Sequence, residues 1–172
     1  MRLNRICKIV AAGMAAVIMM AAPGSIRAQG GATVLTAADA QKLLPASVFY
    51  RGQSATTQLR NSGGVKFADG FYVLATLVDT SGYSTGLAAK YQAYFIVEVP
   101  INVGGKSLPA GVYGAGFIGD KFVLTDVGAH DVLTVAAGDD AVQKHPMPLQ
   151  VAADPSGGFR LYIQRKYVSF SK

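Results

Sequence analysis

The sequence contains almost no cysteine. Cys7 is the only cysteine in 172 residues, so the chain cannot form an internal disulfide, and metal sites built from several thiolates are excluded as well. The fold must therefore be stabilised by packing alone. A chain of this length is close to the commonest domain size and can bury a single hydrophobic core.

The sequence also lacks an apolar run long enough to cross a membrane as a helix. The run near the N-terminus, Ile9–Ala22, has about 14 residues, whereas a transmembrane helix needs about 20. Arg2, Arg5 and Lys8 precede this run, and Ile26-Arg27-Ala28 follows it. A charged start, a short apolar run and small residues form, in that order, a secretory signal peptide.

We therefore predict that residues 1–28 are a signal peptide, cleaved after Ala28, and that residues 29–172 form one exported domain. The predicted location is the periplasm or the outside of the cell, with no integral membrane span after processing. An uncleaved anchor is the alternative. Cys7 lies before the apolar run, so it is not the lipid-accepting cysteine of a lipoprotein signal.

The sequence beyond the predicted signal peptide has little net positive charge. The whole chain has 16 basic and 10 acidic residues. Four of the basic residues lie within residues 1–28, which leaves about twelve basic residues against ten acidic ones. A clustered positive face is therefore not expected, and we expect no nucleic-acid partner.

Helical patterns are almost absent. One short helix is predicted at about residues 36–44, because Thr36 is a good N-cap, Asp39 favours the N-terminal end of a helix and Pro45 ends it. From about residue 47 onward, short runs alternate between apolar and polar residues and are separated by turn residues. These runs are 47–50, 55–60, 65–67, 71–78, 91–99, 112–118, 121–127, 132–137, 147–153, 159–163 and 167–170.

The spacing of these runs predicts an all-β fold: a single-domain antiparallel β-sandwich or flattened barrel of roughly eight to ten strands. The run 71–78 is apolar on both faces, which predicts a central strand covered on each side. Gly114 and Gly116 share one face of a later run. Two glycines on one face leave room for another segment to approach closely.

Glycine and proline mark the expected turns. Gly104-Gly105 predicts a tight reversal, because both residues tolerate positive φ. Pro109 followed by Gly111 predicts a second turn in which Gly111 has a positive φ, so that Gly111→Val is expected to destabilise the fold. Further turns are expected at 61–64, at Gly119-Asp120 and at 138–140. Residues 164–166 form either a turn or a bulge.

The segment VGGKSLPAGVY, Val103–Tyr113, is similar to a turn-and-strand signature, V-x-G-G-K-x-L-P-A-G-x-Y, except for the spacer after the valine. The signature belongs to small secreted bacterial β-domains. Two later segments, PMPLQ at 146–150 and RLY…RKYV at 160–168, are similar to companion segments in some of those proteins. The resemblance implies a β fold and an exported protein. It implies no catalytic residues.

One motif suggests catalysis. Residues 82–86 read G-Y-S-T-G, which matches the G-x-S-x-G of hydrolases with Ser84 as the nucleophile, and His145 lies downstream. That motif requires a strand leading directly into the serine and a substantial helix behind it, on a mostly parallel sheet. Three residues, Asp79-Thr80-Ser81, intervene here. We therefore interpret 82–86 as a loop and predict that Ser84 is not a nucleophile.

Two further groups of residues are candidate sites. Asp126, His130 and Asp131 carry oxygen and nitrogen ligands that a metal could use, but their spacing matches no familiar metal-binding loop. Three tyrosines cluster around the central strands and are candidates for stacking against a ligand, with core packing as the simpler interpretation. They are Tyr83, Tyr91 and Tyr94.

No pattern in the sequence specifies an activity. The function predicted best is a non-catalytic binding or structural module of the cell envelope, without a cofactor. Its partner would be a small apolar ligand held between the sheets or an envelope protein. The alternative is a small serine hydrolase or metal-dependent enzyme that uses the 79–90 loop or the 126–131 turn.

Overall fold

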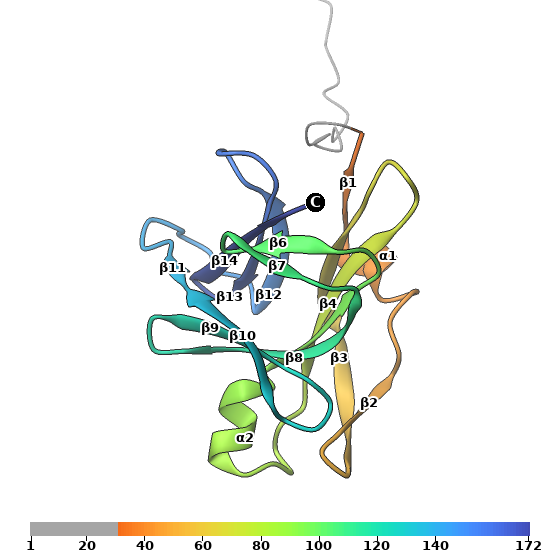
Figure 1. The fold of residues 1–172 in the computed structure, drawn as a ribbon, viewed down its shortest axis with the longest axis vertical. Helices are drawn as coiled ribbons and strands as arrows, with labels where there is room; N and C mark the ends of the chain where they lie inside the picture. Colours follow the sequence, from red (N-terminus) through yellow and green to blue (C-terminus); the bar gives the residue numbers. More distant parts are fainter. Residues whose placement is uncertain (1–30) are drawn as a thin grey trace, which may run out of the picture.

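The computed structural model describes residues 31–172, which form two antiparallel β-sheets and two short helices (Figure 1). The predicted all-β class is confirmed, but the described residues contain fourteen strands, more than the predicted eight to ten. None of the helices in this part of the chain has the length and apolar character needed to cross a bilayer. The predicted signal peptide, residues 1–28, lies outside the described residues.

The larger sheet has eight strands in the order β1-β3-β4-β5-β8-β9-β10, and β2 pairs with β3. Its strands are β1 (Thr33–Leu35), β2 (Ser47–Tyr50), β3 (Gln53–Lys66), β4 (Tyr72–Val78), β5 (Ala93–Val97), β8 (Gly111–Ile118), β9 (Lys121–Thr125) and β10 (Asp131–Ala136). As predicted from its two apolar faces, β4 is a central strand, paired with β3 on one side and β5 on the other.

The smaller sheet has six strands in the order β12-β13-β14-β6-β7, and β11 pairs with β14. Its strands are β6 (Ile101–Val103), β7 (Lys106–Leu108), β11 (Gly138–Asp139), β12 (Leu149–Ala153), β13 (Phe159–Ile163) and β14 (Lys166–Ser171). The chain therefore leaves the large sheet after β5, adds the β6–β7 hairpin to the small sheet and returns to the large sheet in β8.

The main hydrophobic core lies between the two sheets. Alternate residues of β4 and β5, such as Val73 and Phe95, face inward and are fully or almost fully buried. Leu161 and Phe170 of the small sheet face them, and the rings of Phe95 and Phe170 meet edge to face at 6.3 Å. Each such side chain stabilises the fold by about 1.5–3 kcal/mol through burial.

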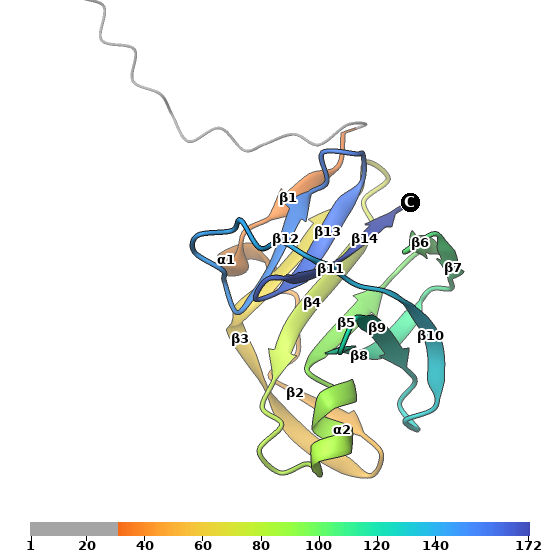
Figure 2. The same ribbon diagram turned by 90° about the vertical axis from the view of Figure 1, so that its left-hand side faces the viewer.

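The small sheet is shorter than the large one. In Figure 2 the strands β12, β13 and β14 cover the upper part of the large sheet, whereas β2, the start of β3 and the second helix continue below them. The second helix, α2 (Thr85–Lys90), was not predicted. The turn between β13 and β14 lies beside Leu77 of β4 and Phe117 of β8, because residues of all three segments line one hollow.

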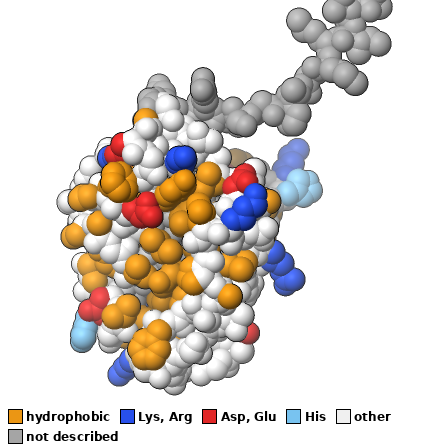
Figure 3. All heavy atoms as spheres, turned by 90° about the vertical axis from the view of Figure 1, so that its right-hand side faces the viewer, with side chains coloured by type: hydrophobic (Ala, Val, Ile, Leu, Met, Phe, Trp, Pro, Cys, Tyr) orange, Lys and Arg blue, Asp and Glu red, His pale blue; other side chains and the backbone are white. Residues whose placement is uncertain are grey.

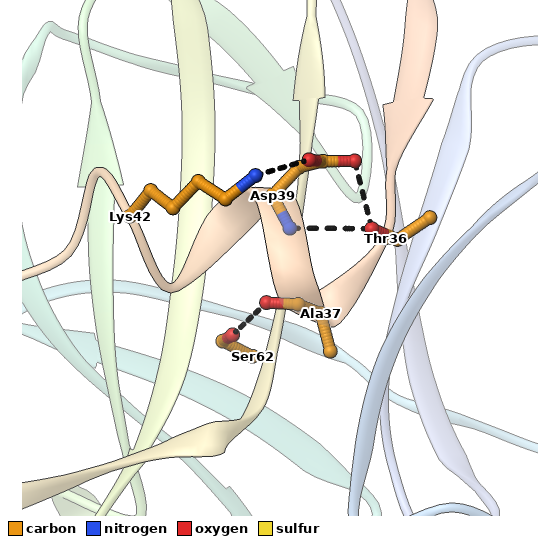
Figure 4. A network of polar contacts seen from close by, with 5 residues as sticks. All are labelled: Thr36, Ala37, Asp39, Lys42 and Ser62. Atoms are coloured by element: carbon orange, nitrogen blue, oxygen red, sulfur yellow. Dashed lines mark hydrogen bonds and ion pairs between the residues drawn. The ribbon is translucent and has the colours of Figure 1, made fainter.

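The first helix, α1 (Ala37–Ala40), begins at the predicted N-cap but is shorter than predicted. Thr36 Oγ1 accepts a hydrogen bond from the Asp39 backbone N–H at 3.2 Å and donates to Asp39 Oδ2 at 2.8 Å (Figure 4). Lys42 Nζ lies 3.1 Å from Asp39 Oδ1, and Ser62 Oγ donates to the Ala37 carbonyl at 3.3 Å. The first three contacts stabilise α1 itself, and the Ser62 contact joins α1 to β3 on the outer face of the large sheet.

Strands begin earlier than predicted, with β1 preceding α1, and the turn predicted at 61–64 is wrong. Strand β3 runs straight through Asn61-Ser62-Gly63-Gly64, with a register shift between Gln58 and Ser62. The glycines allow close approach and not reversal. A Cβ at Gly64 would lie 2.5 Å from the Val73 carbonyl oxygen, and one at Gly63 would lie 3.1 Å from the Val151 nitrogen of the small sheet.

Two of the predicted reversals are present. Gly104 and Gly105 have φ of 53° and 81° and join β6 to β7, and Gly119, with φ of 60°, begins the turn between β8 and β9. Gly111 differs from the prediction, because its φ lies outside the left-handed region. A Cβ there would lie 2.8 Å from Tyr113 Oη, which donates to the Pro109 carbonyl, so side-chain contact opposes substitution and backbone strain does not.

Of the last two predicted turns, the one at 138–140 is wrong and the one at 164–166 is present. Residues 138–139 form strand β11 and not a turn. Gln164 and Arg165 form a two-residue turn, because Ile163 pairs with Lys166, and Gln164 has a positive φ of 57°. The sequence does not distinguish a turn from a bulge here, because residues 164–166 contain no glycine.

The turn between β2 and β3 places a non-glycine residue, Arg51, in the strained left-handed region of backbone conformation. Arg51 and Gly52 have φ of 48° and 81°, and Tyr50 pairs with Gln53 around them. Asn is preferred over other non-glycine residues at the first position of such a turn. We expect Arg51→Asn to raise the free energy of unfolding by about 0.5 kcal/mol, measured by urea denaturation. Arg51→Val, which is β-branched, should lower it; the same stability in both variants would contradict this explanation.

Candidate functional site

A hollow of about 580 Å³ opens between the two sheets beside the β13–β14 turn. We call it the inter-sheet pocket. Its apolar lining residues are Leu77, Val78, Phe117, Pro146 and Ile163. Its polar lining residues are Thr80, Gln92, Asp139, Gln164, Arg165 and Lys166. The pocket lies between the end of β4 and Phe117 of β8 on one side and residues 163–166 of the small sheet on the other; Figure 2 shows the strands to which these residues belong.

Three of the five apolar lining residues extend the main core. Phe117 belongs to that core and contacts Phe122, with ring centroids 4.9 Å apart. Leu77 and Ile163 are half-buried and pack against the same core from opposite sheets. Because no strand of the small sheet continues beyond Ile163 at this place, these side chains keep part of their apolar surface open to the pocket.

Gln92 fixes one wall of the pocket. Its Nε2 donates to the Phe117 carbonyl at 3.1 Å, and its Oε1 accepts from the Phe117 backbone N–H at 3.2 Å. Both ends of the amide are therefore bound to β8, as in a strand pair. The wall is held by the protein itself, which makes the pocket preformed.

Two cations lie at the opening. Arg165 Nη1 donates to the Ala141 carbonyl at 3.1 Å, and Lys166 Nζ donates to the Gly119 carbonyl. The Lys166 side chain thereby joins the small sheet to the β8–β9 turn of the large sheet. Within residues 31–172, neither cation forms an ion pair. Asp139 is opposite Lys166 in the β11–β14 register and is the acid of the lining.

The three candidate tyrosines lie elsewhere, on the outer face of the large sheet beside α2. Tyr83, Tyr91 and Tyr94 form a cluster with Tyr50, which the sequence analysis did not single out. The rings of Tyr50 and Tyr91 stack at 3.7 Å with an interplanar angle of 8°. Tyr91 is 1% exposed, so its ring faces are occupied by the protein and not open to a ligand.

Hydrogen bonding and ionisation fit this buried environment. Tyr50 Oη lies 3.0 Å from Thr125 Oγ1. The hydroxyls of Tyr83 and Tyr91 are buried without a hydrogen-bond partner in the described structure. Burial raises the pKa of the Tyr91 hydroxyl strongly, and it also raises the pKa values of Tyr83 and Tyr94. These phenols stay neutral at ordinary pH, and the cluster acts as a second, smaller core.

The candidate metal ligands have local partners. Asp126 Oδ1 accepts from the backbone N–H groups of Gly128 at 2.8 Å and His130 at 2.9 Å, and Oδ2 lies 3.0 Å from His130 Nδ1. The hydrogen bond from the His130 backbone lowers the pKa of the Asp126 carboxyl. Asp131 instead pairs with Lys90 of α2 at 2.6 Å. No group of three or more His, Cys, Asp or Glu side chains suited to a metal occurs in the described residues.

Ser84 is the exposed N-cap residue of α2, and its side chain makes no capping hydrogen bond. A polar hollow of about 480 Å³ lies beside the 79–90 loop, with Thr56, Asp79, Ser81 and Tyr83 in its lining, but Ser84 does not line it. In the described part of the chain, no hydrogen bond joins Ser84 to a histidine. The arrangement has the serine of the motif without the base that would activate it.

An apolar surface is also exposed on the outer face of the large sheet (Figure 3). Ile96 of β5 pairs with Val112 of β8, and both alternate with core residues, so they point outward. Leu43 after α1 and Phe49 of β2 are 48% and 64% exposed. Tyr72, half-buried, packs beside α1 on the same face.

No protein-family model, no curated protein and no solved structure matches this chain. The candidate site is therefore judged on its geometry. None of the four residues that matter most there is a candidate site residue from the sequence: Leu77, Ile163, Arg165 and Lys166. Adjacent cations at a strand boundary were a visible signal, but the opposite wall comes from a segment far away in the chain.

Proposed function

We propose that this protein is an exported, non-catalytic binding module that holds a small, largely apolar ligand in the inter-sheet pocket. The observation that carries the proposal is the pocket itself, which opens part of the main core to the outside beside the β13–β14 turn. Its volume of about 580 Å³ falls within the range of roughly 300–1,000 Å³ that is typical of small-molecule sites.

The composition of the lining supports binding over catalysis. Among the described residues that line the pocket there is no serine, cysteine or histidine. Nucleophilic catalysis needs an activated nucleophile with a base in hydrogen-bond reach. The lining offers a preformed apolar wall of five residues beside six polar residues, so a bound ligand would contact both apolar and polar groups.

A neutral fluorescent dye such as Nile red tests the proposal. We expect saturable binding of the dye to the purified protein, with one dye per chain. Ile163→Trp should fill the pocket and weaken binding at least about tenfold, because the added ring competes with the ligand for the same volume. The matched control is Val132→Trp, since Val132 is 46% exposed and does not line the pocket.

Two outcomes would contradict the proposal. One is the absence of saturable dye binding to the unsubstituted protein. The other is equal affinity in Ile163→Trp and Val132→Trp, provided that both variants keep the melting temperature of the unsubstituted protein.

A further role follows from the exposed apolar face of the large sheet (Figure 3). Packing of this face against another protein of the cell envelope is the second proposed role, favoured by the exposure of Phe49 and Leu43. Exposed apolar patches of this kind mark interaction surfaces in soluble proteins. Phe49→Ser should leave dye binding unchanged, because Phe49 does not line the inter-sheet pocket.

A further inference from the structure

The cations at the opening of the inter-sheet pocket come from one short turn. Ile163 ends β13 and points its apolar side chain toward the core, and Lys166 begins β14 directly opposite. The two-residue turn places Arg165 beside Lys166. Ile163 and the two cationic residues are thus only a few residues apart in the chain, and all three line the same pocket.

Both cations keep free hydrogen-bond donors. A guanidinium group has five N–H donors and a lysine ammonium has three. Arg165 uses one donor on the Ala141 carbonyl, and Lys166 uses one on the Gly119 carbonyl. These acceptors are neutral. A carboxylate or phosphate oxygen is a stronger acceptor for the same donors, so Lys166 can exchange its carbonyl for an anionic group without crossing a large distance.

The balance of charge on the lining favours an anion. The lining contains two cationic residues, Arg165 and Lys166, and one acidic residue, Asp139. Asp139 faces Lys166 across the β11–β14 pair, yet no ion pair joins them in the described structure. The neighbouring acid, Asp140, accepts instead from Tyr162 Oη at 3.5 Å. The positive charge of the rim is therefore only partly compensated.

We propose that the ligand of the inter-sheet pocket is an anionic amphiphile, whose apolar body contacts Leu77, Phe117 and Ile163 and whose carboxylate or phosphate is bound by Arg165 and Lys166. This inference rests on the proposed function and adds the chemical class of the ligand. The two possible head groups share the chemistry that the cations recognise, and they differ in charge and in the number of acceptor oxygens.

Displacement of Nile red by three ligands with the same alkyl chain tests the inference. The ligands are decanoate, decyl phosphate and decanol. We expect at least one of the anions to bind about tenfold more tightly than decanol, because decanol lacks the charge that the cations recognise. The better anion identifies the head group. The preference should shrink as salt is added, because the opening is exposed to solvent.

Single substitutions assign the preference to named residues. Arg165→Gln and Lys166→Gln should each weaken binding of the preferred anion about tenfold and leave decanol unaffected. Asp139→Asn should strengthen anion binding, since it removes the opposing charge. The matched control is Lys106→Gln: Lys106 Nζ also joins the two sheets, through the Thr134 carbonyl at 3.1 Å, but it does not line this pocket.

The outcomes separate the inference from the function on which it rests. Equal affinity for decanol and both anions, or a preference that persists in both Arg165→Gln and Lys166→Gln, would overturn the inference and leave the proposed function intact. If neither the dye nor any of the three ligands binds to the unsubstituted protein, both are wrong. A melting temperature measured for each variant separates loss of binding from loss of folding.

Discussion

Replacing Asp154 by alanine is expected to lower the free energy of unfolding by about 3 kcal/mol, the lower end of the range for removing one partner of a buried ion pair, because the Arg160 side chain is 20% exposed. The Asp154 side chain is 4% exposed, and its Oδ2 lies 3.0 Å from Arg160 Nε. Ser169 Oγ donates to the same oxygen at 2.6 Å, and the Ser156 backbone N–H donates to Oδ1 at 2.9 Å. The variant would leave the Arg160 guanidinium, stacked 4.2 Å from the Tyr167 ring centre, without its counter-ion.

The same carboxylate makes stability depend on pH. Burial raises the pKa of Asp154, but the hydrogen bonds from Arg160, Ser169 and Ser156 outweigh it and lower the pKa from 3.8 to about 2. A group whose pKa is lower in the folded state stabilises the fold above its unfolded pKa, and the effect is lost as pH falls through the folded pKa. We expect a loss of about 2 kcal/mol between pH 4 and pH 2, and a smaller loss in Asp154→Asn.

Urea denaturation at neutral pH and through this acid range measures both effects. The control is Asp131→Ala, which breaks the exposed ion pair between Asp131 and Lys90. The side chain of Lys90 is 34% exposed and that of Asp131 is 49% exposed. Exposed pairs contribute roughly 0–1 kcal/mol. A loss in Asp154→Ala no greater than that in Asp131→Ala would show that the Asp154–Arg160 pair is not the stabilising contact described above.

A second large effect is expected at Gly114 of β8. A Cβ at this position would lie 1.8 Å from Tyr91 Cδ2 and 2.8 Å from Thr125 Oγ1. The Tyr91 ring cannot move aside, because Tyr50 stacks on it at 3.7 Å. Overpacking of a well-ordered core costs about 1–3 kcal/mol and occasionally more. We expect Gly114→Ala to lower the free energy of unfolding by about 3 kcal/mol, near the upper end of this range, as measured by thermal or urea denaturation.

A double-mutant cycle isolates the cause. In a Tyr91→Leu background the ring is absent, so Gly114→Ala should lower the free energy of unfolding much less than it does in the unsubstituted protein. Gly86 of α2 provides the control, because a Cβ there meets nothing within 4 Å, and Gly86→Ala should raise helix stability by about 0.5–1 kcal/mol. An equal effect of Gly114→Ala in both backgrounds would exclude the Tyr91 ring as the reason for glycine.

The strands and this close approach could be predicted because they depend on local patterns. Alternation around Phe95 placed its strand, and the paired glycines Gly114 and Gly116 predicted the approach of another segment. A Cβ at Gly116 would indeed lie 2.1 Å from the Ala89 carbonyl oxygen of α2. In these cases the sequence signal and its physical cause lie within a few residues.

The sequence predictions are wrong where the role of a residue depends on a contact with a segment far away in the chain. Gly63 and Gly64 have the composition of a turn, but the contacts that require them come from Val151 and from Val73. Helix α2 was not predicted because its six residues, TGLAAK, contain a glycine and follow the polar loop DTSGYS. Glycine has two uses, reversal and close approach, and the local sequence does not distinguish them.

The inter-sheet pocket could not be predicted for the same reason. Leu77, Phe117 and Ile163 come from β4, β8 and β13, and their convergence depends on how far the small sheet extends over the large one. The alternation pattern predicts the face of the strand on which each side chain lies, but it does not predict which residue of the opposite sheet that side chain will contact. The sequence supports the general hypothesis of an apolar ligand between the sheets but does not locate a pocket for it.

The position of the β6–β7 hairpin determines how this chain can fold. Strand β6 reaches the small sheet by pairing with β14, where Val103 faces Phe170, while the strands on either side of the hairpin, β5 and β8, pair with each other in the large sheet. Neither sheet is therefore encoded by one continuous stretch. A nascent chain cannot complete the small sheet until its last strand is available, and pairings this distant in sequence place folding toward the slow end, about milliseconds to seconds, of single-domain proteins.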